Sequence, residues 1–223
     1  MNAKELFDKI SPEYEKWRDE LTSSSASVRF QDYGAVSPKL DLSQEDMYTG
    51  RVNEKPMSDL CRQGFKNEKL KDLFNIIYKH QPKLILELGT LCGMSSLYMS
   101  AASKNAVIHT IEGAPEVAKI AMSTFTNFSV TGRVNLHVGR FQDVLPDLLP
   151  RLKGLDCAMI DGHHNGDATI EYYDMIKNRM TSGGLIIFDD IRWSDGMLKA
   201  WEHITDVNPD FEDYGSFGSI VLG

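Results

Sequence analysis

The sequence lacks any uninterrupted run of about 18 apolar residues, the length that a membrane-spanning helix requires. Residues 1–7 mix charged and apolar side chains and lack the apolar core of a secretion signal. We therefore expect neither a membrane span nor a membrane partner.

Cysteine is also scarce. The three cysteines, Cys61, Cys92 and Cys157, form no closely spaced pair and leave an odd number. Cys92 and Cys157 fall in or beside predicted core strands, where a free thiol packs as a small apolar side chain. The simplest expectation is a reduced protein in the cytoplasm.

Basic residues form no long cluster, and 24 Lys and Arg against 32 Asp and Glu give a net charge of −8. A nucleic-acid partner is not expected, because affinity for a polyanion comes largely from neutralising its phosphates. The apolar content of 42% is that of an ordinary globular protein. A length of 223 residues suits one α/β domain with an extension and is short for two full domains.

What the sequence does contain is an apolar strand at residues 84–88 that runs into a glycine turn, from Gly89 to Gly93. Glycines at such a turn let the backbone bend tightly and approach a ligand at the carboxyl end of the first sheet strand. A second apolar strand, residues 107–111, ends in Glu112, 23 positions after Gly89. An acid there is placed to accept two hydrogen bonds from a ribose. The pattern indicates an adenosine-type cofactor.

The spacing of the turn disfavours a dinucleotide. A dinucleotide fingerprint needs a second glycine where the backbone approaches the pyrophosphate, and Leu91 occupies that position. A cofactor without phosphates fits better than NAD. The alternative is a buried strand and tight turn in some other doubly wound domain.

Glu87, Gly89, Gly93 and Ser95 together resemble the first motif of class I S-adenosylmethionine (SAM)-dependent methyltransferases, especially the catechol O-methyltransferase-like branch. The segment around Gln142 resembles the family's adenine-contacting segment after the third strand. The segment from Phe188 to Trp201 is also similar to a group of bacterial methyltransferase-domain proteins. The resemblance covers residues 65–222 and implies SAM as cofactor, bound by a set of seven residues: Glu87, Gly89, Gly93, Ser95, Glu112, Gln142 and Asp161.

After Pro82 strand-like and helix-like segments alternate, which implies crossover units and a parallel sheet covered on both faces. We expect strands at 83–88, 107–112, 134–138, 156–161, 184–189, 207–213 and 217–222, and helices at 94–103, 115–128, 141–151, 167–179 and 194–205. The last two strands are joined by a turn without a helix, so the last strand should be antiparallel. The predicted fold is a doubly wound, mostly parallel seven-stranded α/β sheet, as in the Rossmann-like methyltransferases, with an N-terminal helical extension.

The extension is harder to interpret. Apolar residues from Leu6 to Leu21 recur at helical spacing, and we expect two short helices separated at Ser11 and Pro12. Residues 32–53 have no clear period and could be a lid or a surface connection. Helical spacing returns over residues 57–80. We assign residues 1–60 to the extension and residues 61–223 to a SAM-binding methyltransferase domain; the extension's aromatic helices make a homodimer plausible.

A second group of acids ends two later strands: Asp161, and the pair Asp189 and Asp190. Carboxyl ends of parallel strands meet at one edge of a sheet, and carboxylates brought together repel unless a cation or proton intervenes. Oxygen ligands suit Mg²⁺. By resemblance these residues match the metal-ligand positions of divalent-dependent O-methyltransferases, although Asp190 replaces the asparagine of the catechol type. In the alternative, Asp161 holds the cofactor's amino group or orders a loop, and Asp189 accepts hydrogen bonds from backbone N–H groups.

His164 matches the general-base position of the same family, where the catechol type has a lysine, and Asp161 is its partner in catalysis. A histidine has a pKa suited to removing a hydroxyl proton, but His163 beside it leaves the choice between the two open. Trp193 and Trp201 are expected to pack in the core, with Trp193 a weaker candidate for covering an acceptor. The resulting hypothesis is metal-assisted methyl transfer to a hydroxyl of a small molecule; the alternatives are a metal-free N- or O-methyltransferase and a non-catalytic binding module.

Overall fold

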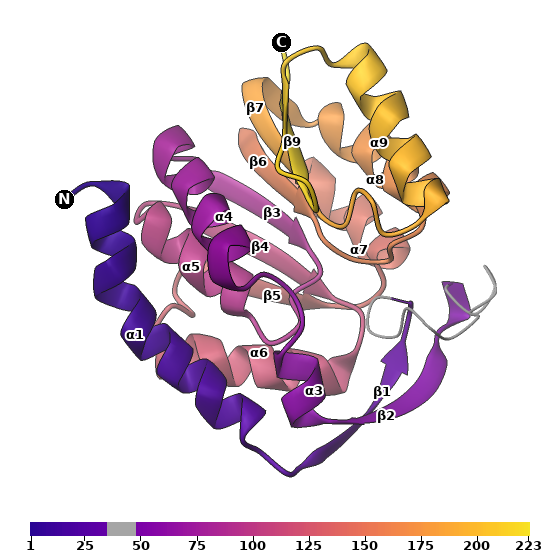
Figure 1. Cartoon of the computed structure of the whole chain (residues 1–223). Coiled ribbons are helices and arrows are strands. Elements are labelled where there is room, and N and C mark those ends of the chain that lie inside the picture. Colours follow the sequence, from indigo (N-terminus) through magenta and orange to yellow (C-terminus); the bar gives the residue numbers. More distant parts are fainter. Residues whose placement is uncertain (35–47) are drawn as a thin grey trace.

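The computed structural model describes residues 1–34 and 48–223. Its centre is a seven-stranded sheet with the order β5-β4-β3-β6-β7-β9-β8 (Figure 1). The strands are β3 (Leu84–Leu88), β4 (Val107–Glu112), β5 (Val134–Val138), β6 (Leu155–Ile160), β7 (Met180–Phe188), β8 (Phe211–Asp213) and β9 (Gly218–Val221). The pairs from β5 to β7 are parallel, whereas β9 is antiparallel to both β7 and β8. The predicted mostly parallel sheet with an antiparallel last strand is confirmed.

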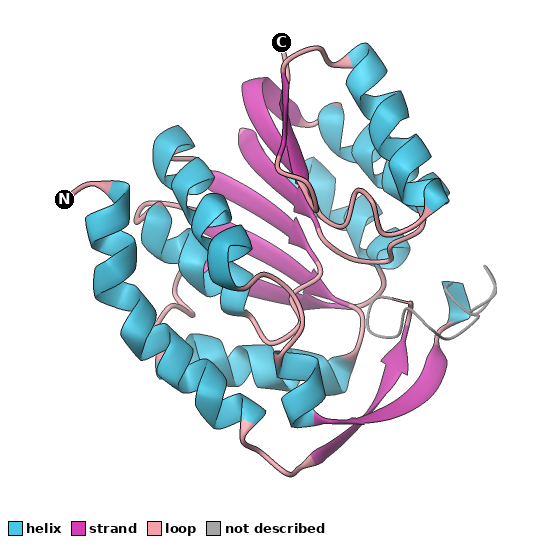
Figure 2. Cartoon of the chain, in the orientation of Figure 1, coloured by secondary structure: helices cyan, strands magenta, loops and turns pink. Residues whose placement is uncertain are grey.

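Helices cover both faces of this sheet (Figure 2). They are α4 (Asn67–His80), α5 (Met94–Ala102) and α6 (Pro115–Asn127) on one face, and α7 (Phe141–Leu148), α8 (Gly166–Lys177) and α9 (Asp195–Val207) on the other. Alternate residues of one strand serve the two faces: Ile85 packs under the first layer, and Leu86 and Leu88 under the second. This explains why the parallel strands are almost continuously apolar. A short 3₁₀ turn, η1 (Leu149–Arg151), follows α7.

The chain reverses direction across the sheet at β3. Strands β4 and β5 are added on one side of β3, and β6 and β7 on the other. Such a switch opens a crevice beyond the carboxyl ends of the two central strands, β3 and β6. The glycine turn follows β3, and Asp161 follows β6. The fold therefore brings the two predicted groups of residues to the same crevice.

The N-terminal helix is continuous, contrary to the prediction of two short helices. Helix α1 (Ala3–Thr22) runs through Pro12 alongside α4 and α5 (Figure 1). An interior proline removes one helical hydrogen bond, but an apolar stripe along α1 packs against the core and outweighs this cost: Leu6, Phe7, Ile10, Tyr14 and Trp17. The Ser11 hydroxyl also donates to the Phe7 carbonyl at 2.7 Å.

The extension is not wholly helical. Strands β1 (Ser27–Asp32) and β2 (Arg51–Pro56) form a separate antiparallel pair that packs on α6 through Phe30 and Val117. The prediction of a lid or surface connection concerns a segment whose centre, residues 35–47, lies outside the described residues. The sequence shows no apolar alternation over these strands because most of their side chains are polar.

Two further boundaries differ from expectation. Residues 57–80 form α3 (Met57–Cys61) and α4 rather than one helical segment. The chain breaks between them because Gly64 and Asn67 adopt left-handed backbone conformations, with φ of +75° and +53°. Near the C-terminus, α9 extends to Val207, so β8 starts later than the predicted strand at 207–213. Throughout residues 1–34 and 48–223, no helix combines the length and the apolar character needed to cross a membrane.

Candidate functional site

A cavity of about 350 Å³ lies at the crevice between β3 and β6. This volume is in the range of small-molecule sites. The predicted residues that border it are Gly89, Ser95, Glu112, Gln142, Asp161, His164, Asp189 and Asp190. Residues of the extension, including Phe30 and Tyr33, also line it. The sheet thus brings together residues that are up to 160 positions apart in the chain.

The glycine turn (residues 89–93) depends on both of its glycines. Gly89 has φ +99°, and a Cβ there would lie 1.8 Å from the backbone oxygen of Asp161. Gly93 has φ +81°, and its Cβ would meet the Phe125 ring at 2.7 Å. The close approach that Gly89 permits is therefore to the neighbouring β6 segment, not only to a ligand. Between them, Leu91 lies in the left-handed region at φ +50°, a strained conformation for a branched side chain.

Glu87 lies beneath this turn and does not border the cavity. It is fully buried, and its carboxylate accepts hydrogen bonds from the Ser95 and Ser96 hydroxyls and from Thr110 Oγ1, the last at 2.5 Å. Thr90 Oγ1 in turn lies 2.6 Å from Thr110 Oγ1. Burial raises the pKa of Glu87, and the three hydroxyl donors oppose that rise. Glu87 is one of the seven residues predicted to bind the cofactor; in the structure its described contacts are these hydroxyls, and it supports the start of α5.

Glu112 does border the cavity, and backbone donors hold its carboxylate. Leu91 N–H donates to Oε2 at 2.9 Å, and Ala114 N–H donates to Oε1 at 3.0 Å. Burial raises the pKa of Glu112 to about 7, while these backbone hydrogen bonds act to lower it. Each oxygen keeps a lone pair that a ligand hydroxyl could use. Gln142 lies at the start of α7, on the same side of the cavity.

The opposite side holds the acid rim, which we define as Asp161, Asp189 and Asp190. A lysine that the sequence did not suggest, Lys69 of α4, lies among them: its Nζ is 2.5 Å from Asp189 Oδ1 and 3.6 Å from Asp190 Oδ1. Burial raises the pKa of Asp161 well above its usual value, as does the adjacent Asp189 carboxylate, while Lys69 opposes the rise. Burial acts to lower the pKa of Lys69, but the surrounding carboxylates outweigh it and the pKa is raised.

This arrangement does not fit the Mg²⁺ site that the resemblance implies. The Lys69 ammonium already pairs with Asp189 and lies near Asp190, the two carboxylates that should bind the ion. Burial and the neighbouring Asp189 carboxylate raise the pKa of Asp161, whereas a carboxyl that binds a metal ion must be deprotonated. Among residues 1–34 and 48–223, no group of three His, Cys, Asp or Glu side chains is arranged to hold a metal.

The two adjacent histidines are held differently. His163 is buried, its Nδ1 lies 2.9 Å from the Tyr172 hydroxyl, and its pKa is lowered to about 4, first by burial and then by the neighbouring His164. His164 Nε2 lies 3.5 Å from Asp190 Oδ2, and its ring packs beside Trp193. Of the two, His164 is thus the one paired with the acid rim. Trp193 is 44% exposed and borders the cavity, whereas Trp201 is buried in the core as expected.

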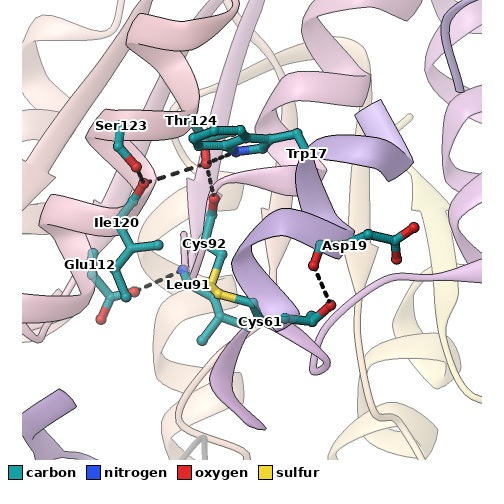
Figure 3. Close-up of a disulfide and its surroundings, with 10 residues drawn as sticks. Trp17, Asp19, Cys61, Leu91, Cys92, Glu112, Ile120, Ser123 and Thr124 are labelled. Carbon is teal, nitrogen blue, oxygen red and sulfur yellow. Dashed lines mark hydrogen bonds between the residues drawn. A yellow bond between two sulfur atoms is a disulfide. The ribbon is translucent and has the colours of Figure 1, made fainter. Parts of the chain in front are cut away.

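A disulfide between Cys61 and Cys92 joins α3 to the glycine turn (Figure 3). The expectation of a free Cys92 thiol is therefore wrong; Cys157 is free and buried, as expected. Figure 3 also shows a second link: Trp17 Nε1 of α1 donates to Thr124 Oγ1 at 3.0 Å, and Thr124 Oγ1 donates to the Cys92 carbonyl at 2.8 Å. Helices α1 and α3 are thereby each linked to the glycine turn. A separation of 31 residues gave no sign of the pairing.

Lys69 is the main site residue that the sequence analysis missed. One weak signal existed: Lys69 lies in the first turn of α4, where the helix dipole disfavours a cation. Such a position suggests a function elsewhere, but the acids that Lys69 meets are about 120 positions away.

Residues 86–191 match a family described as a methyltransferase domain. A catechol O-methyltransferase from Niastella koreensis is 33% identical over 113 residues, which are 50% of this chain and 50% of that protein. The chain spans about half the length of the curated relatives it matches.

Solved structures show the same fold. An O-methyltransferase from Bacillus cereus, in complex with S-adenosylhomocysteine (SAH), has a TM-score of 0.65 and 20% identity, covering 74% of this chain and 86% of that chain. The O-methyltransferase TomG from Streptomyces achromogenes, involved in tomaymycin synthesis and in complex with SAM, has a TM-score of 0.62 and 23% identity, covering 74% and 83%. Residues 86–191 are therefore similar to a methyltransferase domain, and the chain has the fold of these solved structures.

Proposed function

We propose that the protein transfers the methyl group of SAM to a hydroxyl oxygen of a small molecule. The observation that carries this proposal is one cavity bordered on one side by the glycine turn and Glu112, and on the other by the acid rim and His164. The first side suits an adenosine cofactor, and the second contains a base and charged groups that can receive a hydroxyl. The named relatives and structures, all O-methyltransferases, point the same way.

In this proposal the cofactor lies along the glycine turn. Glu112 accepts hydrogen bonds from the two ribose hydroxyls with the lone pairs that its backbone donors leave free. The positive end of α5, near Ser95, favours the carboxylate of the methionine part. Gln142 lies beside the adenine, and Asp161 accepts from the methionine amino group. Glu87 acts indirectly, by fixing the hydroxyls beneath the turn.

The acceptor lies against the acid rim. His164, held by Asp190, takes the proton of the acceptor hydroxyl. The oxygen then forms a bond to the sulfonium methyl carbon as the carbon–sulfur bond breaks, leaving a methyl ether and SAH. The sulfonium is already activated, so the protein contributes chiefly by positioning the two reactants.

We further propose that residues 1–60 complete the site of the domain formed by residues 61–223. Phe30 and Tyr33 border the same cavity, and α1 is linked to the glycine turn through Trp17. A homodimer through the extension stays a prediction from the sequence.

The proposal is tested by calorimetric titration of SAH into the purified protein. We expect saturable heat at micromolar concentration, which Glu112→Ala abolishes. Glu116→Ala is the matched control, because Glu116 is an acid on α6 whose exposed side chain pairs only with Lys119 among its described contacts. Tritium from methyl-labelled SAM should then pass to an acceptor among phenolic and aliphatic alcohols. A folded protein that gives no heat with SAH overturns the proposal.

A further inference from the structure

Lys69 lies at a helix position that disfavours a positive charge, and its side chain contacts the acid rim. It lies in the first turn of α4, where a cation is opposed by the helix dipole. Its side chain is only 22% exposed and borders the cavity. The ammonium lies 4.5 Å above the centre of the Phe65 ring, and this cation–π contact further stabilises the position of the ammonium. Three separate contacts therefore fix this side chain against the acid rim.

Lys69 occupies the place that a divalent ion would need. A Mg²⁺ ion requires carboxylate oxygens at about 2.0–2.1 Å, and Asp189 Oδ1 already has the Lys69 ammonium at 2.5 Å. Two cations on one oxygen repel each other strongly at such distances. Metal binding would therefore require that Lys69 leave a buried ion pair.

The ammonium has donors to spare. Lysine carries three N–H groups; Asp189 Oδ1, at 2.5 Å, accounts for one of them, whereas Asp190 Oδ1, at 3.6 Å, lies beyond hydrogen-bond distance. A remaining N–H can reach an oxygen inside the cavity that Lys69 lines. His164 approaches Asp190 from the other side, at its Oδ2. A hydroxyl placed between the ammonium and the imidazole would meet a positive charge and a proton acceptor together.

We propose that Lys69 binds the acceptor oxygen and supplies, from within the chain, the positive charge for which related enzymes use a divalent cation. This inference rests on the proposed function. The hydroxyl proton passes to His164, and the negative charge left on the oxygen is stabilised by the Lys69 ammonium. The oxygen then bonds to the methyl carbon, the carbon–sulfur bond breaks, and Lys69 keeps its proton throughout.

The first test measures metal binding. The electron paramagnetic resonance signal of added Mn²⁺ reports how much of the ion is free. We expect the wild-type protein to leave Mn²⁺ free at millimolar concentration. The Lys69→Met variant, which keeps the apolar stem and vacates the cation position, should bind Mn²⁺, and adding Asp189→Asn should abolish that binding. Stoichiometric Mn²⁺ binding by the wild-type protein that Asp189→Asn removes would overturn the inference.

The second test separates turnover from cofactor binding. Lys69→Met should lower kcat by about 100-fold, the usual loss when a charge-stabilising donor is removed, and change SAH affinity by less than about threefold. Lys71→Met is the matched control, because Lys71 lies on the same helix and pairs with the exposed Glu68. Lys69→Arg should restore part of kcat, since it restores the charge. If the Lys69→Met variant keeps the kcat of the wild-type protein, the inference is contradicted. If the wild-type protein does not bind SAH, it is the proposed function that is contradicted. If Lys69→Met does not fold, the wild-type Mn²⁺ result still decides.

Discussion

The two sides of the cavity stabilise their buried carboxylates with different kinds of partner. On the side of the glycine turn, Glu87 is surrounded by hydroxyls and Glu112 accepts from backbone N–H groups. These donors are neutral. On the acid rim, Asp189 and Asp190 face the Lys69 ammonium, which carries a full positive charge.

This difference matches what each side would receive. Neutral donors leave the Glu112 side with its negative charge, which suits the sulfonium of the proposed cofactor. The ammonium offsets part of the negative charge of the acid rim, so an acceptor oxygen that becomes negative is repelled less there. The comparison therefore assigns one side to a cation and the other to an oxyanion, and it can be tested from either side.

The largest expected effect is on stability, and it comes from reducing the disulfide that holds the glycine turn. Reduction of the Cys61–Cys92 disulfide, which closes a separation of 31 residues, should lower the free energy of unfolding by about 3.5 kcal/mol. Denaturant unfolding with and without dithiothreitol measures this loss. The Cys61→Ser/Cys92→Ser variant should not respond to dithiothreitol; an equal response in both proteins would assign the effect elsewhere.

The same chemical change on each side should give opposite readouts. Glu112→Gln removes one acceptor and turns an amide donor toward a backbone N–H, so SAH affinity should fall by about tenfold. Asp189→Asn should leave SAH affinity within about threefold while kcat falls by about 100-fold, because Lys69 loses its nearest partner. Calorimetry and methyl-transfer assays measure the two quantities. Equal losses of affinity in both variants would contradict the division of the cavity.

The pH dependence of binding should follow Glu112. Because burial raises the pKa of this carboxyl to about 7, and the ionised form is the better acceptor, SAH affinity should rise with pH and level off above 7. At pH 6 it should be about tenfold below the plateau. The stability of the ligand-free protein should change in the opposite direction. The Glu112 carboxyl ionises at lower pH in the unfolded chain than in the folded protein, so the free energy of unfolding should fall as pH rises from 4.5 to about 7. Titrations of Glu112→Gln should lack the rise in affinity; a rise that persists there would point to another group.

The smallest effect concerns the hydrogen bonds that fasten α1 to the turn. Thr124→Val removes the acceptor of Trp17 Nε1 and the donor to the Cys92 carbonyl, and should cost about 1–2 kcal/mol of unfolding free energy. Ser123→Ala is the neighbouring control, since its hydroxyl bonds only to the Ile120 carbonyl of its own helix among the described contacts. Chemical denaturation of both variants measures the difference. Equal costs would mean that the link from α1 contributes nothing specific.

Local patterns carried much of the fold. The apolar strands at 84–88 and 107–112 were recognisable because parallel strands are buried on both faces, and the alternation of strands and helices implied crossover units and a parallel sheet. The same logic placed Glu112, Asp161 and Asp189 at one sheet edge. By contrast, Pro12 suggested a helix break that α1 does not have, because packing against α4 and α5 decides the outcome there.

The sequence by itself determined the α/β architecture, the glycine turn and the acids that end the strands, because each depends on residues close together in the chain. Only the tertiary structure decided how those acids are neutralised. Lys69 reaches Asp189 across about 120 positions, Cys61 bonds to Cys92, and Glu87 turns away from the cavity to meet Thr110. These partners are chosen by the packing of separate elements, and no local pattern records which side chains that packing brings within reach.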